Sequence, residues 1–92
     1  MARVVVTFSI MPESPDVDLK DIETKSLEKI KSFAGTDDYK VSVEPIAFGL
    51  KAVKIMFVMD EDKGSTDDLE ADIETIDGVN SVEVTDVRRA IG

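Results

Sequence analysis

Carboxylates are the most abundant side chains in this chain that could carry chemistry. There are 20 Asp and Glu residues but no Cys and no His, which excludes thiol nucleophiles, disulfides, zinc fingers and imidazole catalysis. A catalytic carboxylate pair needs surroundings that separate its two pKa values, whereas these acids fall on helix surfaces and in loops. We therefore expect neither covalent catalysis nor a cofactor.

One acidic stretch, residues 60–64 (DEDKG), has a faint similarity to a calcium-binding loop. The EF-hand pattern requires glycine at the sixth position and a bidentate glutamate at the twelfth. Here Gly64 is the fifth residue, and Ala71 stands where the glutamate should be. We expect weak, adventitious binding of divalent ions at most, and no metal site.

The net charge indicates which kinds of molecule could bind this chain. A charge of -9, from 20 acidic and 11 basic residues, would repel nucleic acid and anionic membranes. A basic protein partner is the better expectation, although the acids could also serve solubility alone. The chain shows no long apolar run and no signal-peptide pattern after Met1, so we expect a soluble, cytoplasmic protein.

Four segments alternate apolar and other residues with the period of a strand: residues 3–11, 39–45, 50–59 and 79–89. The expected core face of the first and third comprises Val4, Val6, Phe8, Ile10, Val53, Ile55, Phe57 and Met59. In the last strand, Val82 and Val84 would be buried. Pro45 ends the second strand, so a turn is expected there.

Two segments have the period of a helix. The first places Leu19, Ile22, Ser26, Ile30 and Phe33 along one face. Asp16 or Asp18 can cap its start, and Gly35 can close its end. In the second, Leu69, Ile73 and Ile76 form an apolar stripe. Ser65 and Asp68 are spaced as a capping box at its start, and Gly78 is the expected stop.

The resulting order, βαββαβ, predicts an α+β, ferredoxin-like split βαβ fold in a single domain over residues 1–92. Right-handed crossovers would place both helices on one face of a four-stranded antiparallel sheet and leave the other face open. Copper-binding versions of this fold need a cysteine pair, and RNA-binding versions need basic, aromatic strands. Neither pattern is present.

Residues 45–55 (PIAFGLKAVKI) and 58–73 (VMDEDKGSTDDLEADI) resemble the guanine-nucleotide exchange domain family of translation elongation factor 1-beta, in its small archaeal form. The signature combines a proline, an aromatic-glycine turn, a basic strand start and an acidic stretch before a helix. The resemblance covers essentially the whole chain. It implies a factor that releases nucleotide from the GTPase elongation factor 1-alpha. Separately, we expect the chain to be monomeric when free.

The resemblance also implies partner-binding residues. The family is understood to disturb the magnesium and phosphate environment of the GTPase with the turn aromatic and a lysine near the C-terminus. The turn aromatic corresponds to Phe48, flanked by Gly49, and Lys51 is the basic strand start. Phe48 would be an exposed apolar anchor; alternatively, it folds back to cover a sheet edge.

At the C-terminal position Arg89 stands in place of the family's lysine, with Arg88 beside it. Arginine keeps the positive charge but is larger and planar, so the exchange is not conservative at a tight site. Alternatively, Arg88 and Arg89 are simply exposed bases that reduce the negative charge of the strongly acidic second half of the chain. Two other functions stay open for the whole chain: a small-molecule-binding regulatory module that dimerises edge to edge, and a purely structural subunit.

Overall fold

Four strands and two helices follow one another in the order that the sequence predicts. They are β1 (Arg3–Pro12), α1 (Leu19–Ala34), β2 (Tyr39–Pro45), β3 (Lys51–Asp60), α2 (Asp67–Glu74) and β4 (Val79–Ala90). Two short 3-10 turns, η1 (Ala47–Gly49) and η2 (Glu61–Lys63), flank β3. The computed structural model describes residues 3–35 and 37–90, without the side chains of Phe48 and Ala90.

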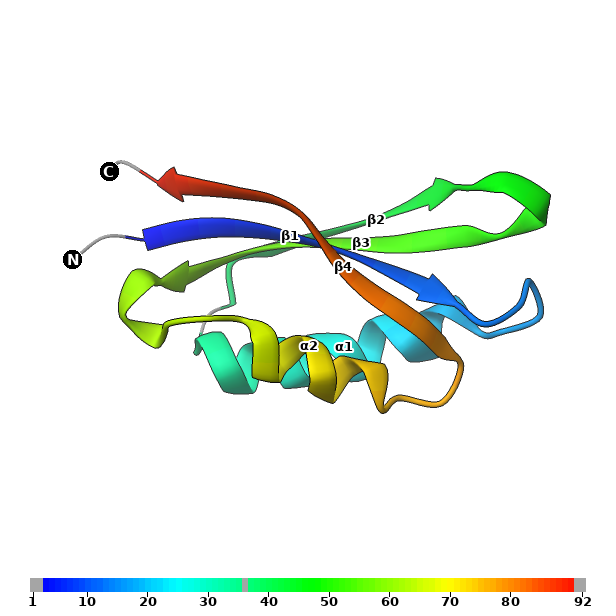
Figure 1. The fold of residues 1–92 in the computed structure, drawn as a ribbon, viewed down its shortest axis with the longest axis horizontal. Coiled ribbons are helices and arrows are strands. Elements are labelled where there is room, and N and C mark those ends of the chain that lie inside the picture. The colour runs from blue at the N-terminus through cyan, green and yellow to red at the C-terminus, as the bar shows by residue number, and fades with distance from the viewer. Residues whose placement is uncertain (1–2, 36, 91–92) are drawn as a thin grey trace.

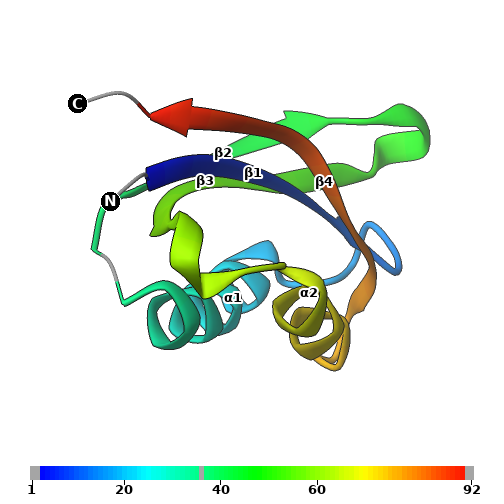
Figure 2. The ribbon, with the colours of Figure 1, turned by 60° about the vertical axis from the view of Figure 1, so that its left-hand side comes forward.

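The strands form one sheet in the order β2-β3-β1-β4, and every neighbouring pair is antiparallel. Both helices lie against one face of this sheet and leave the other face open (Figure 1). The two-layer arrangement is seen along the helices in Figure 2. The predicted ferredoxin-like split βαβ fold is confirmed, with β2 and β4 as its edge strands.

The core lies between the central strands and the helices. Phe8 on β1 and Phe57 on β3 are both fully buried, and their rings meet edge to face with centroids 5.1 Å apart. The alternating residues of both strands surround this pair, as the period-two pattern requires. Val4 is half-buried, whereas the other seven residues of the expected core face are buried. Val82 and Val84 on β4 pack against the core while remaining half-buried.

The ends of α1 are set by local polar contacts. Of the two candidate caps, Asp18 is the one used: its Oδ1 accepts a hydrogen bond from the Lys20 amide at 3.0 Å. Gly35 ends the helix in the left-handed conformation, as predicted. On the buried face, Ser26 has no solvent exposure, and its hydroxyl has no hydrogen-bond partner.

The start of α2 differs from the predicted capping box. Thr66 is the N-cap residue, one position later than expected, and its side chain makes no capping bond. The Ser65 hydroxyl instead accepts from the amide of Asp67, two residues away, at 3.1 Å. The Thr66 hydroxyl donates to Glu70 at 2.8 Å. The prediction was wrong because Ser65 forms a local turn and does not reach the amide of Asp68.

The end of α2 also comes earlier than the predicted stop at Gly78. The helix ends at Glu74, and the Thr75 hydroxyl donates to the Asp72 carbonyl at 2.6 Å. Ile76 is still buried, but it lies in the turn that follows and not on the helix. Within residues 3–35 and 37–90, no helix is both long and apolar enough to cross a membrane.

Candidate partner-binding sites at the two ends of the sheet

The connection between β2 and β3, residues 45–51, forms the first candidate site, called here the hairpin end. The Ile46 amide donates to the Leu50 carbonyl at 2.7 Å, and the Leu50 amide donates to the Ala47 carbonyl at 3.2 Å. Gly49 adopts a positive φ of 76°, which an L side chain rarely adopts. Pro45 pairs with Lys51 on an edge strand, where a missing amide is tolerated. The expected turn is therefore confirmed.

The hairpin end presents both apolar and basic groups to solvent. Gly49 and Lys51 are exposed, whereas the Phe48 side chain lies outside the described residues, so its anchor role stays a prediction. Ile46 is 41% exposed and Val43, at the end of β2, is 49% exposed. Neither residue was among the predicted partner-binding residues. An apolar residue directly after the strand-ending Pro45 was the available signal for Ile46.

Arg88 and Arg89 lie at the opposite end of the sheet, near the end of β4. They pair with Val5 and Val4 of β1, and successive strand residues point to opposite faces. Arg88 forms an ion pair with Asp86, two residues earlier on its own strand, at 2.8 Å. The two arginines therefore do not act as one cationic patch.

Arg89 forms a bidentate ion pair with Glu61. Its Nε donates to Glu61 Oε2 at 3.0 Å, and its Nη2 donates to Oε1 at 3.0 Å and to Oε2 at 2.8 Å. This bidentate geometry matches the planar fork of guanidinium to a carboxylate. Both side chains remain partly exposed, at 65% for Arg89 and 45% for Glu61. Arg88, Arg89 and Glu61 are called here the arginine end.

Glu61 is a residue of the arginine end that the sequence analysis missed. It belongs to the acidic DEDK stretch and lies in η2, directly after β3. Since β3 and β4 both flank β1 in antiparallel register, the end of β3 must lie near the end of β4. The predicted split βαβ fold therefore already implied that an acid at this position can reach a base near the C-terminus.

A small pocket, lined in part by apolar residues, lies at the arginine end, and Glu61 is one of its lining residues. It has a volume of about 290 Å³ and lies between β4 and the segment that enters α2. Its lining includes Val4, Val6, Met59 and Val87. Val87 is 59% exposed, which leaves an apolar side chain next to Arg89 at the surface. The arginine end thus combines charge with a small apolar surface.

The structure does not bring the two sets of predicted residues together. Lys51 begins β3 and Asp60 ends it, so the two ends are separated by roughly 30 Å at about 3.3 Å per strand residue. Figure 1 shows the β2–β3 connection and the end of β4 at opposite ends of the long axis. In the described ranges, 3–35 and 37–90, no group of three or more acids is placed to hold a metal ion.

Comparison with known proteins identifies the family. The model of the EF-1 guanine nucleotide exchange domain matches residues 5–90. Elongation factor 1-beta of Methanothermobacter thermautotrophicus is 46% identical over 89 residues, covering 97% of this chain and 98% of that protein. The same factor of Methanobrevibacter smithii is 42% identical with the same coverage, and that of Aeropyrum pernix is 39% identical over 90 residues. The match includes both ends of the sheet, and the chain belongs to the EF-1 guanine nucleotide exchange domain family.

Proposed function

We propose that this chain is the exchange factor for the GTPase elongation factor 1-alpha, promoting release of GDP and loading of GTP during polypeptide elongation. The observation that carries the proposal is the family match, which extends over residues 5–90 and so includes both helices and the whole sheet except Arg3 and Val4 of β1. The chain would act as a cytoplasmic, monomeric protein-binding module. No covalent step is required of it, because exchange changes only the affinity of the GTPase for its nucleotide.

A rigid sheet with contacts at both ends suits this task. Nucleotide is held on a GTPase by magnesium and by backbone amides that surround the phosphates. Suppose that a partner binds the GTPase more tightly when one of these loops has moved than when it holds the nucleotide. That partner lowers the affinity for nucleotide, and the difference between its affinities for the two loop positions sets how far. Phe48 would anchor the hairpin end on one surface of the GTPase. The arginine end, roughly 30 Å away along β3, would then contact a second surface.

Arg89 is the residue proposed to contact the phosphate or magnesium environment. To do so it must exchange the carboxylate of Glu61 for an oxyanion of the partner or nucleotide. Because both side chains are substantially exposed, the existing pair contributes only about 0–1 kcal/mol, and its loss is a small obstacle. The guanidinium fork that now binds a carboxylate is equally suited to phosphate oxygens.

The acidic excess supports the same assignment. A GTPase that carries tRNA is expected to present basic surface, which a chain of net charge -9 would approach faster at low salt. We expect the association rate of the two proteins, measured by stopped-flow fluorescence, to fall as ionic strength rises. A rate independent of salt would contradict this electrostatic steering.

The experiment that tests the function measures release of a fluorescent GDP analogue from purified elongation factor 1-alpha, with and without substoichiometric chain. We expect nucleotide release to accelerate, with each molecule of the chain acting on many GTPase molecules in turn. Arg89→Ala should lower it, whereas Lys40→Ala, which removes a cation from exposed β2, should not. No acceleration of an active GTPase would overturn the proposal and favour the small-molecule-binding module. A ligand-induced rise in melting temperature would then be the next measurement.

A further inference from the structure

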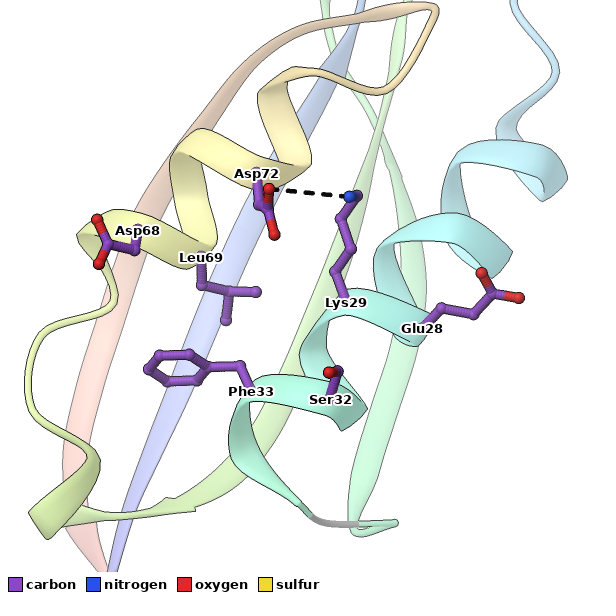
Figure 3. A pocket seen from close by; sticks show the side chains of 7 residues that line it. All are labelled: Glu28, Lys29, Ser32, Phe33, Asp68, Leu69 and Asp72. Atoms are coloured by element: carbon purple, nitrogen blue, oxygen red, sulfur yellow. Dashed lines mark ion pairs between the residues drawn. The ribbon is translucent and has the colours of Figure 1, made fainter.

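A groove of about 420 Å³ runs between the two helices, on the layer that covers the sheet. Figure 3 shows its lining: Glu28, Lys29, Ser32 and Phe33 from α1, and Asp68, Leu69 and Asp72 from α2. None of these residues belongs to the hairpin end or the arginine end. The groove is therefore a separate surface from the one used in the proposed function.

The floor of the groove is apolar. Phe33 and Leu69 face each other from the two helices in Figure 3, and both pack on the core. Leu69 is only 3% exposed, whereas Phe33 is half-buried and keeps part of its ring open to solvent. An apolar side chain placed over this ring would remove further apolar surface from water, which is favourable.

The rim of the groove is acidic. Three carboxylates, Glu28, Asp68 and Asp72, lie around it, and Lys29 is the one base among its described lining residues. Lys29 forms a long ion pair with Asp72 at 3.9 Å, and the carboxylate remains 64% exposed. The helix that supplies one wall, α2, has the sequence DDLEADIE, with five acids and no base. A strongly negative wall thus borders an apolar floor.

The negative charge of the groove indicates which kinds of molecule could bind there. A second copy of the chain carries a net charge of -9, and nucleic acid or an anionic membrane is negative as well, so all three would be repelled. The polar residues described in its lining are exposed or half-buried, so they do not form the converging buried set that fixes the orientation of a small ligand. A segment that is basic and carries a large apolar side chain complements both the rim and the floor.

We propose that the groove between α1 and α2 docks a lysine- or arginine-rich segment of a partner protein, with an apolar side chain over Phe33. The basic groups of that segment would pair with Asp68 and Asp72, displacing the long contact from Lys29. Because the pairs would form at an exposed rim, each would be weak, and specificity requires the apolar anchor as well.

The test uses fluorescence anisotropy of a short labelled peptide built of lysine and leucine, with no GTPase present. Binding should weaken roughly fivefold in the double variant Asp68→Asn, Asp72→Asn. The matched control is Glu13→Gln, Glu83→Gln, which removes the same charge from exposed sites outside the groove and should preserve most of the affinity. A peptide with serine in place of leucine should bind more weakly than the parent.

Equal weakening by the two double variants would overturn the proposal, because it would show general charge attraction. Equal binding of the serine and leucine peptides would overturn it too. Amide chemical shifts should change at Lys29, Phe33 and Leu69 on peptide addition, and changes confined to the arginine end would contradict a groove site. Since no GTPase is used, failure of this test leaves the exchange measurement unaffected.

Discussion

The hairpin end and the arginine end of the same sheet are held in different ways. Backbone hydrogen bonds across a short turn close the hairpin end, where Ile46 and the neighbouring Val43 of β2 remain exposed. At the arginine end, the side chains of Glu61 and Arg89 link η2 to the edge strand β4 through a bidentate ion pair. The first end therefore offers apolar contact on a hydrogen-bonded turn, whereas the second offers a charge that can change partner.

The strongest test of the comparison removes the core that connects the two ends. Phe57→Ala should lower the free energy of unfolding by about 3–5 kcal/mol, because the ring is fully buried against Phe8. Chemical denaturation measures this loss. Met56→Ala is the matched control, since the adjacent side chain is 39% exposed on the open face and should cost much less. Similar losses would mean that the ends do not depend on one core.

A second test asks whether a glycine of the hairpin end can be replaced at low cost because open space surrounds it. Gly49 and Gly78 both have a positive φ, and Gly78 lies at the same end of the sheet, just before Val79 pairs with Pro12. A Cβ on Gly78 would approach Val17 to 2.7 Å, whereas one on Gly49 would meet nothing within 4 Å. Thermal unfolding should show a loss of about 2 kcal/mol for Gly78→Ala and about 1 for Gly49→Ala. Equal losses would rule out the steric difference.

The third test concerns the apolar contact at the hairpin end. Phe48→Ala should weaken binding to elongation factor 1-alpha by more than about 1 kcal/mol, or roughly fivefold in Kd, with little change in fold stability. Calorimetric titration and a melting curve measure the two quantities on the same variant. If stability and binding fall together, Phe48 covers the sheet edge and is not an anchor.

The smallest effect is expected at the arginine end. A double-mutant cycle of Glu61→Gln and Arg89→Ala should give a coupling energy of about 0.5–1 kcal/mol for stability, decreasing as salt is added. The comparison pair is Arg88 and Asp86, which lie on the same strand. Their coupling energy should be smaller, because their contact does not link two different elements of the fold. Coupling at Glu61 and Arg89 well above 1 kcal/mol would mean that the charge is locked in place and poorly suited to exchange partners.

Much of the fold could be predicted from local pattern alone. Alternation identified the buried faces of β1 and β3, and Asp18 and Gly35 were recognised as possible ends of α1. These features depend on neighbours within a few residues, so the sequence specifies them directly. The N-cap of α2 was predicted wrongly because the side chains of Ser65, Thr66 and Glu70 each have several hydrogen-bond partners within reach. Local sequence does not decide which of these bonds forms.

Sequence alone determined the secondary-structure order, the acidic character and the absence of thiol and imidazole chemistry, since these follow from residue types and their spacing. Tertiary packing brings Arg89 to Glu61, 28 positions away, turns Arg88 to the other face, and joins Phe33 and Leu69 in one groove. The physical reason is that strand register and helix packing join residues remote in sequence. Side-chain direction then depends on which face of the sheet each position occupies.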